Sequence, residues 1–163
     1  MKKTFLLFCY LLLVTIAKAQ LDKTPLYFQF PDVPPFSITK TPDNTLFTKN
    51  DLKKRKATLI MLFSPDCDHC QQQVKALKEN IDLLKQVQIV MVSFLNDDLI
   101  KKFYLENEMA AYSTITMGRD GKYFLGTFYK FTTFPSMYLY NKKGKFIEKF
   151  EGITPINKIA ASL

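Results

Sequence analysis

The residues best suited to chemistry are two cysteines separated by two residues, in the run Cys67-Asp68-His69-Cys70. At the start of a helix, this spacing brings both sulfur atoms within disulfide range. The unpaired N–H groups of the helix N-terminus also favour the thiolate form of the first cysteine. A thiolate is the nucleophile of thiol–disulfide exchange. The pattern therefore predicts a redox-active pair that alternates between a dithiol and a Cys67–Cys70 disulfide.

Helical periodicity assigns a role to each cysteine. Cys70, Val74 and Leu77 follow one another at spacings of four and three, so they share the face of the helix that turns toward the core. We expect Cys70 to be the buried, resolving thiol. Cys67, at the helix start, is expected to be the exposed, attacking thiol.

Two other interpretations of the pair remain open. A structural disulfide that closes so short a loop constrains the unfolded chain little, because this stabilisation grows with loop length. A structural zinc site needs four ligands, whereas Cys67, His69 and Cys70 are the only thiol or imidazole ligands after residue 19. We therefore favour the redox interpretation and predict no metal.

Residues 1–19 have the pattern of a secretory signal peptide. Two lysines precede an apolar stretch from Phe5 to Ala17, and small residues at positions 17 and 19 predict cleavage before Gln20. The protein is then expected to be exported, with the periplasm as its compartment. The alternative is an uncleaved signal anchor that keeps the protein at the membrane. Cleavage would remove Cys9 and leave the two cysteines of the pair.

Length and charge exclude several classes of protein. The chain has 163 residues, with 23 Lys and Arg, 15 Asp and Glu, and one His. This length suits a single domain, and a single histidine excludes a His-rich metal site. Removal of three lysines with the signal peptide would lower the net charge from +8 to +5. A modest charge and an exported location argue against nucleic-acid binding. We expect a monomer.

The cysteine pair lies inside a predicted strand–helix–strand unit. Thr58 to Phe63 is an apolar run of strand length, as in strands buried on both faces. A helix follows from Cys67 to about Gln86, and Ile89 to Phe94 forms a second buried strand. Such a unit implies two parallel strands. A further helix is expected from Asn96, its N-cap, to about Met109.

The rest of the chain supplies shorter elements around this unit. They comprise an extended Pro-rich arm, a hairpin, a short helix in a less regular stretch, a second hairpin and a last helix capped by Thr154. The arm is expected at 20–36, and the first hairpin at Ser37 to Lys40 with Leu46 to Thr48. The short helix is expected at 121–129. The second hairpin is expected at Ser136 to Tyr140 with Lys145 to Phe150, and the last helix at 154–163. We therefore predict a central mixed sheet with helices on both faces.

The sequence resembles the thioredoxin-like superfamily and, within it, the exported TlpA/ResA-type thiol-disulfide oxidoreductases. The matching features are the strand Leu59–Phe63, the loop Ser64-Pro65-Asp66, the cysteine motif on its helix, and Thr133-Phe134-Pro135-Ser136 before the second hairpin. The resemblance implies an α/β three-layer sandwich, with a central mixed β-sheet flanked by helices. It places this domain at 37–163, and the added N-terminal β-hairpin of the subgroup lies at its start.

The resemblance also implies a substrate-binding loop. Pro135 would be the cis-proline that faces the cysteine pair, and Phe134 would offer its backbone to a client strand. From the residues alone, Pro135 could equally be an ordinary proline at the start of a strand. The implied partners are client proteins with disulfides or thiols and a membrane or periplasmic dithiol electron donor. No cofactor is implied, because the dithiol itself carries the electrons.

Three features depart from the pattern of the superfamily. Met61 stands where thioredoxins carry a buried acid, Asp66 replaces the usual Trp, and Asp68-His69 lacks the usual Pro. The proton of Cys70 must then pass to water or to another group, for which Glu108 and Asp120 are candidates.

The residues around the pair are expected to tune its redox behaviour. His69 and the helix N-terminus favour the Cys67 thiolate, whereas Asp66 and Asp68 oppose it. Since a stabilised thiolate makes the disulfide a stronger oxidant, this opposition favours a reductant. His69 could equally be a solvent-exposed spacer.

Aromatic residues are dense in the segment that leads to Pro135. They are Tyr123, Phe124, Phe128, Tyr129, Phe131 and Phe134. These side chains either pack in the core or form an apolar lip that receives client segments.

Two further functions use the same thiols. One is a metal or cytochrome-maturation chaperone without turnover, although the familiar copper chaperones of this fold have a longer cysteine spacing and a distant His. The other is a thiol peroxidase, although Ser64 stands where such enzymes usually have Thr.

Overall fold

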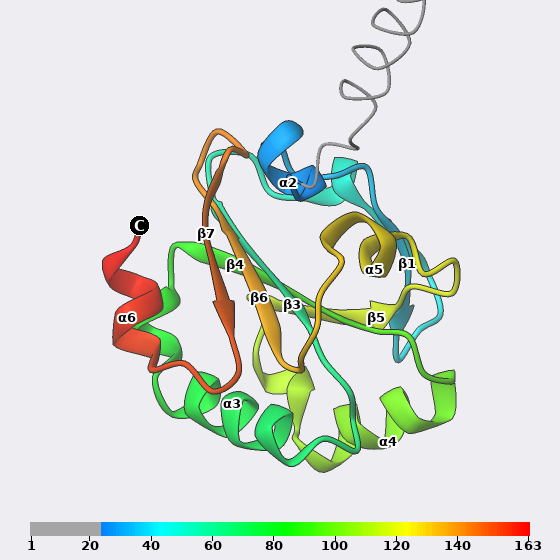
Figure 1. The fold of residues 1–163 in the computed structure, drawn as a ribbon. Coiled ribbons are helices and arrows are strands. Elements are labelled where there is room, and N and C mark those ends of the chain that lie inside the picture. The colour runs from blue at the N-terminus through cyan, green and yellow to red at the C-terminus, as the bar shows by residue number, and fades with distance from the viewer. Residues whose placement is uncertain (1–23) are drawn as a thin grey trace, which may run out of the picture.

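The computed structural model describes residues 24–163, so the predicted signal peptide lies outside the described residues. One mixed sheet of seven strands, in the order β2-β1-β5-β4-β3-β6-β7, runs through the middle of the molecule (Figure 1). The strands are β1 Ser37–Thr41, β2 Leu46–Thr48, β3 Ala57–Leu62, β4 Val87–Ser93, β5 Ile115–Arg119, β6 Ser136–Tyr140 and β7 Phe146–Glu151. The α-helices are α2 Leu26–Gln29, α3 Asp68–Glu79, α4 Asp97–Glu106, α5 Phe124–Tyr129 and α6 Ile156–Ala161. Three short 3₁₀ helices are η1 Lys49–Asp51, η2 Ile81–Leu84 and η3 Met109–Ala111.

The central strands are the apolar runs predicted from the sequence. Every residue of β3 and of β4 is buried, because both faces of these strands are covered. β3 pairs in parallel with β4, and α3 connects them, which confirms the predicted strand–helix–strand unit. β4 also pairs in parallel with β5, whereas β6 runs antiparallel to β3 and to β7.

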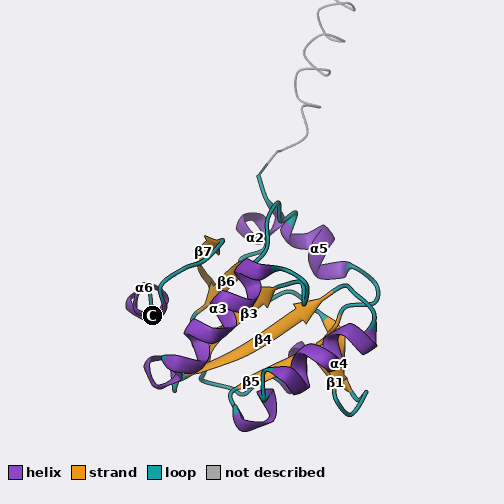
Figure 2. Cartoon of the chain, turned by 90° about the horizontal axis from the view of Figure 1, so that it is seen from below, coloured by secondary structure: helices purple, strands orange, loops and turns teal. Residues whose placement is uncertain are grey.

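Two hydrophobic layers lie on opposite faces of the sheet. Alternate side chains of β3 point to opposite faces, so Leu59 and Met61 join one layer while Ile60 and Leu62 join the other. The first layer includes residues of α3, α4 and α6, and the second includes residues of α2 and α5. Figure 2 shows α3 and α4 lying across one face of the sheet. The predicted mixed sheet with helices on both faces is confirmed.

The strand β5 was not predicted from the sequence. Its segment contains Gly118, which usually weakens a strand. In the structure, a Cβ atom at this position would collide with the carbonyl oxygen of Thr39. Gly118 pairs with Lys40 of β1, so the glycine lets the N-terminal hairpin approach the central sheet closely.

The described part of the predicted extended arm is less extended than expected. It contains the one-turn helix α2, and Tyr27 of this helix is buried in the second hydrophobic layer. Asp32 then forms a β-bridge with Lys145 beside β7. These contacts tie residues 24–36 to the sheet.

The predictions for the remaining elements differ in accuracy. Both hairpins are present, and the Asn96 side chain caps α4 by accepting a hydrogen bond from the Leu99 amide at 2.9 Å. The helix after the cysteines ends at Glu79, earlier than expected, and a 3₁₀ turn follows. The prediction that Thr154 caps the last helix is wrong: Pro155 is the N-cap, and no side chain caps this helix. No helix within residues 24–163 is both long and apolar enough to cross a bilayer.

Candidate redox site

The cysteine pair lies where β3 ends and α3 begins. Cys67 is the N-cap residue, with an extended backbone, and Cys70 lies in the first turn of the helix. The loop before them contains Pro65, which cannot donate a hydrogen bond to continue the strand ladder. The Gln71 side-chain amide donates a hydrogen bond to the Pro65 carbonyl oxygen at 3.0 Å. This hydrogen bond connects the first turn of α3 to the loop that precedes it.

The two thiols have different surroundings, as the helical periodicity predicted. Cys70 is fully buried, and Val74 and Leu77 belong to the same hydrophobic cluster. Cys67 is partly exposed and packs against the edge of that cluster. Both are free thiols, so the structure holds the dithiol form of the pair.

Burial is the main influence on the Cys70 thiol. Removal from water raises its pKa well above the usual range, because the charged thiolate is disfavoured in an apolar environment. The backbone amide of Ser64 donates a hydrogen bond to Cys70 Sγ at 3.5 Å, which acts in the opposite direction. A side-chain hydrogen bond with Cys67, the charge of Cys67 when it is ionised, and the Asp66 carboxylate raise the pKa further.

The loop before β6 brings Phe134 and Pro135 beside the pair. Cys67 Sγ donates a weak hydrogen bond to the Phe134 carbonyl oxygen at 4.0 Å, and the Phe134–Pro135 peptide bond is cis. The Ser136 hydroxyl donates to the Thr133 carbonyl oxygen at 2.7 Å. The Gly152 amide donates to the Pro135 carbonyl oxygen at 2.9 Å. These bonds hold the loop in place from both sides.

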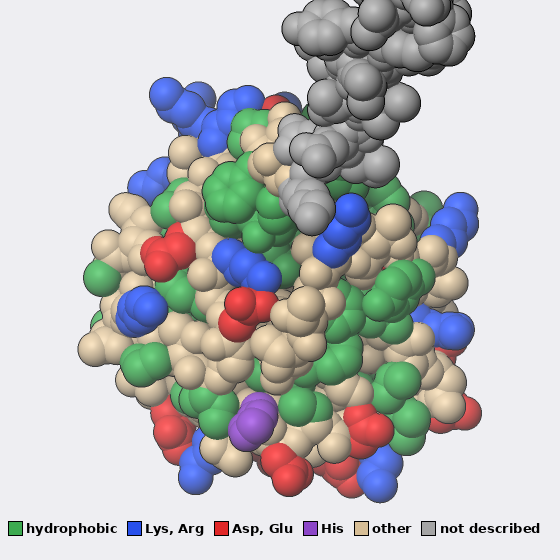
Figure 3. All heavy atoms as spheres, in the orientation of Figure 1, with side chains coloured by type: hydrophobic (Ala, Val, Ile, Leu, Met, Phe, Trp, Pro, Cys, Tyr) green, Lys and Arg blue, Asp and Glu red, His purple; other side chains and the backbone are tan. Residues whose placement is uncertain are grey.

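The polar residues of the motif lie at the surface. Asp66, Asp68 and His69 are all exposed, and the histidine is visible at the surface in Figure 3 (purple). Asp66 has a structural partner, because its carboxylate accepts a hydrogen bond from the hydroxyl of Ser64. The site therefore combines one buried thiol, one accessible thiol and two acidic side chains close in sequence to the accessible thiol.

Sequence and structure comparisons agree with this geometry. The sequence profile of the thioredoxin-like domain family matches residues 44–163. The chain belongs to the thioredoxin-like family. No curated protein sequence matches it.

Several solved structures share the thioredoxin-like fold of this chain. StoA from Bacillus subtilis has 19% identity and a TM-score of 0.63, and the match covers 81% of this chain and 98% of StoA. A secreted disulfide oxidoreductase from Mycobacterium tuberculosis, homologous to DsbE, has 14% identity and a TM-score of 0.65. The match covers 78% of this chain and 93% of the oxidoreductase. The thioredoxin domain of a thiol-disulfide oxidoreductase from Bacteroides vulgatus has 20% identity and a TM-score of 0.63. The match covers 80% of this chain and 94% of that domain.

The two acids considered as proton acceptors lie elsewhere in this thioredoxin-like domain. Asp120 is buried, and its carboxylate accepts hydrogen bonds from the Leu125 amide at 2.7 Å and the Lys122 amide at 3.2 Å. It therefore stabilises the start of α5. Glu108 is exposed in the turn between α4 and η3. Neither is among the groups that shift the pKa of Cys70.

The aromatic segment divides into two parts. Phe128 and Tyr129 are buried in the second hydrophobic layer, as the packing alternative predicted. Three other rings form a series of contacts that begins at Phe134. The ring centroid of Phe131 lies 4.7 Å from that of Phe134 and 5.6 Å from that of Phe94. Tyr123 stands 4.5 Å from Phe94 and is about half exposed. Phe94 was missed from the sequence because it lies at the end of a different strand.

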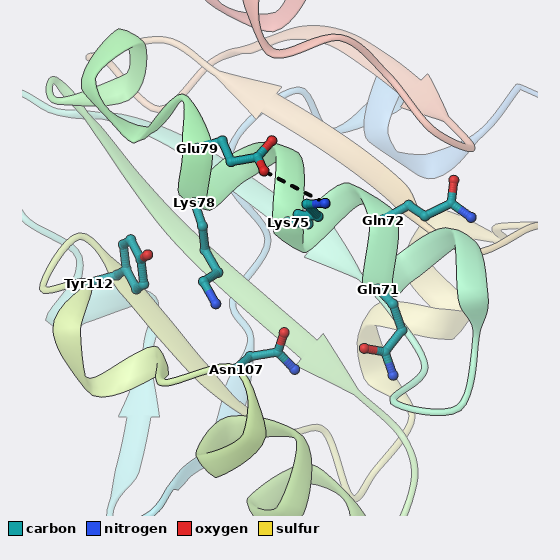
Figure 4. A pocket seen from close by; sticks show the side chains of 7 residues that line it. All are labelled: Gln71, Gln72, Lys75, Lys78, Glu79, Asn107 and Tyr112. Carbon is teal, nitrogen blue, oxygen red and sulfur yellow. Dashed lines mark ion pairs between the residues drawn. The ribbon is translucent and has the colours of Figure 1, made fainter.

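A hollow of about 620 Å³ lies beside the helix of the cysteines but contains neither thiol. Figure 4 shows its lining, which combines α3 side chains with two residues that follow α4. A Lys75–Glu79 ion pair at 3.9 Å crosses its wall, and Lys78 Nζ lies 5.9 Å from the centroid of the Tyr112 ring. Within residues 24–163, no group of three or more His, Cys, Asp or Glu side chains could hold a metal ion.

Proposed function

We propose that the protein is an exported thiol-disulfide oxidoreductase that exchanges electrons with client proteins through Cys67 and Cys70. The observation that carries this proposal is the asymmetry of the pair. One thiol is accessible beside the Phe134 carbonyl oxygen, and the other is buried on the same helical turn. Thiol–disulfide exchange requires this division, with one sulfur to meet the client and a second to release it.

The reaction transfers two electrons in two steps. The Cys67 thiolate attacks one sulfur of a client disulfide, which forms a mixed disulfide and releases one client thiolate. Cys70 then loses its proton and attacks Cys67 Sγ. This step closes the Cys67–Cys70 disulfide and releases the second client thiolate, which takes up a proton from solvent. The protein is oxidised, the client is reduced, and a dithiol protein at the membrane or in the periplasm must restore the dithiol.

The loop at Phe134 and Pro135 is suited to hold the client. The Phe134 carbonyl oxygen faces Cys67, so a client strand could pair with this backbone while its own sulfur approaches Cys67 Sγ. The aromatic rings that continue from Phe134 offer partly exposed apolar surface beside this strand. A client segment with apolar residues next to its cysteine would fit both features.

The proposed direction and location rest on separate observations. Asp66 and Asp68 are exposed on either side of Cys67, and they oppose the stabilisation of its thiolate by the helix and His69. A less stabilised thiolate favours a reductant. Export is supported by the signal-peptide pattern of residues 1–19 and by the likeness to a secreted oxidoreductase.

A disulfide-reduction assay tests the proposal. We expect the purified protein to accelerate the reduction of insulin disulfides by dithiothreitol, and Cys67→Ser to abolish this activity. Cys70→Ser should leave one mixed disulfide per molecule, which can be trapped and identified in the native host. Equilibration with glutathione measures the reduction potential of the Cys67–Cys70 disulfide. This potential should be closer to that of thioredoxin, about −270 mV, than to that of DsbA, about −120 mV. Absence of any exchange by the wild-type dithiol would overturn the proposal.

A further inference from the structure

The buried Cys70 thiol needs a proton acceptor before it can attack. Only the thiolate form of a cysteine is nucleophilic, and burial holds Cys70 in its protonated form. In this chain the neighbouring strand offers no base, because Met61 of β3 is apolar and fully buried. Cys70 itself belongs to a cluster of buried hydrophobic side chains.

The titratable groups that influence Cys70 are Cys67 and Asp66. In the mixed disulfide, Cys67 is bonded to the client and cannot accept a proton. Asp68 and His69, which lie on the same turn, are not among the groups that shift the pKa of Cys70. Asp66, an exposed residue of the loop before α3, is therefore the charged group that still acts on Cys70 when the proton must leave.

Ser64 links Asp66 to Cys70. Its backbone amide donates a hydrogen bond to Cys70 Sγ at 3.5 Å, while its hydroxyl donates to the Asp66 carboxylate. Ser64 is itself buried, with 9% of its surface exposed, so these two contacts are held at a fixed place in the loop. One residue thus positions both the donor of the proton and a carboxylate.

We propose that Asp66 is the base that receives the Cys70 proton when the mixed disulfide resolves, and that Ser64 is the positioning residue that holds its carboxylate. The proton leaves Cys70 Sγ for a carboxylate oxygen of Asp66. The electron pair of the resulting thiolate forms the bond to Cys67 Sγ, and the client leaves as a thiolate. Asp66 then returns its proton to solvent. This inference rests on the proposed exchange function, and it assigns the task of the missing buried acid to a residue on the loop.

The two sulfur reactions can be separated with the neutral disulfide 4,4′-dithiodipyridine. Reduced protein mixed with excess reagent releases a first thiopyridone in a bimolecular phase, when Cys67 attacks. A second thiopyridone follows in a unimolecular phase, when Cys70 resolves the mixed disulfide. Stopped-flow absorbance resolves the two phases, and the second phase reports on the transfer of the Cys70 proton.

We expect Asp66→Asn to slow the second phase about 100-fold or more near neutral pH. Asp68→Asn is the matched control, since it also removes one exposed negative charge beside Cys67, and it should leave the second phase within about twofold of wild type. Asp66→Glu should recover most of the rate, and Ser64→Ala should slow the phase less than Asp66→Asn. The rate of the Asn variant should also rise more steeply with pH than that of wild type, because water or hydroxide must then accept the proton.

Whether Asp66→Asn slows or accelerates the second phase decides between two roles for Asp66. If Asp66 acted only as a like charge, its removal would favour the Cys70 thiolate and accelerate the second phase. A second phase in Asp66→Asn that is as fast as wild type, or faster, overturns the assignment of the base and leaves the exchange function intact. If the wild-type protein shows no second phase, the exchange mechanism itself fails and the assignment fails with it. Thermal unfolding of each variant verifies that it is folded.

Discussion

Gln73 and Thr154 lie 81 residues apart in the sequence, and they exchange two hydrogen bonds in the interior of the protein. The Gln73 side-chain amide donates to the Thr154 carbonyl oxygen at 3.0 Å, and the Thr154 amide donates to Gln73 Oε1 at 2.6 Å. Gln73 is fully buried on α3, three residues after Cys70. The helix of the cysteines is therefore fastened to the loop that connects β7 with α6.

Substitution of this glutamine should destabilise the protein. Gln73→Leu removes both hydrogen bonds and leaves the amide and carbonyl groups of Thr154 buried without this partner, at a cost of about 2–5 kcal/mol. Urea unfolding should show this loss in the free energy of unfolding. Gln72→Leu, at an exposed position of the same helix, should change it by less than about 0.5 kcal/mol. Equal effects of the two substitutions would mean that the paired hydrogen bonds add nothing to stability.

The different burial of the two thiols should appear in their reactivity. Iodoacetamide should modify Cys67 in the native reduced protein and spare Cys70, because Cys70 is buried and its pKa is raised. Peptide mapping by mass spectrometry identifies the modified residue. Both cysteines should react in urea, which serves as the control. Preferential modification of Cys70 in the folded protein would contradict the assigned order of attack.

The same raised pKa gives the reduced protein a dependence on pH. In the folded state Cys70 keeps its proton at pH values where the unfolded thiol, with a pKa of about 8.5, has lost it. Its contribution to stability is therefore complete below about pH 8.5, and it decreases as the pH rises above that value. Urea unfolding of the reduced protein across this range should show the decrease. The Cys70→Ala variant retains Cys67 but lacks the Cys70 thiol, so its stability should decrease less over the same pH range.

Two buried tyrosines of the second hydrophobic layer should be energetically coupled. The hydroxyl oxygens of Tyr129 and Tyr140 lie 2.7 Å apart, and burial raises the pKa of both phenols. Tyr129→Phe leaves the Tyr140 hydroxyl without this partner and should cost about 1–3 kcal/mol. The double Phe variant should cost less than the sum of the single variants, as a double-mutant cycle measures. Strict additivity would show that the contact contributes no coupling.

The raised pKa of the two phenols also predicts behaviour at high pH. Both remain protonated in the folded state above about pH 10, where unfolded tyrosine ionises. The protein should therefore lose stability as the pH rises above this value, and the double Phe variant should lose less. Unfolding by urea at a series of alkaline pH values provides the measurement.

The aromatic rings next to Phe134 can be tested for a role in client binding. Phe131 is only partly buried and packs against both Phe94 and Phe134. Phe131→Ser should slow the reduction of protein disulfides severalfold while leaving the reaction with 4,4′-dithiodipyridine unchanged. The exposed Leu105→Ser is the control, and it should affect neither reaction. Unchanged kinetics with protein clients in a folded Phe131→Ser variant would mean that this ring serves packing alone.

Local patterns in the sequence predicted the centre of the fold well. The apolar runs of β3 and β4 and the periodicity of α3 are strong signals, because burial on both faces of a sheet or on one face of a helix constrains every position. The same periodicity correctly predicted that Cys70 is buried and Cys67 accessible. The features that were missed depend on partners distant in the sequence. Threonine is a common N-cap residue, yet the backbone of Thr154 forms hydrogen bonds with the Gln73 side chain instead.

The link between Ser64 and Asp66 was also missed, although these two residues are close in the sequence. Asp66 was expected only to oppose the thiolate of Cys67, since nothing in the order of residues shows which side chain its carboxylate will meet. The contact depends on the turn that follows β3, which carries the Ser64 amide to Cys70 and its hydroxyl to Asp66. Folded geometry was needed to separate this acid from Asp68, which has the same chemistry.

Because β1 approaches β5 so closely, the N-terminal hairpin can pair with the central sheet only if residue 118 carries a hydrogen atom in place of a side chain. A methyl group in its place would collide with the Thr39 backbone, which has no rotamer by which to move away. The N-terminal hairpin would have to separate from the central strands, although β3, β4 and the cysteines do not depend on that contact. The two strands that the hairpin adds to the edge of the sheet are thus attached at a residue without a side chain, and any larger residue there would force β1 away from β5.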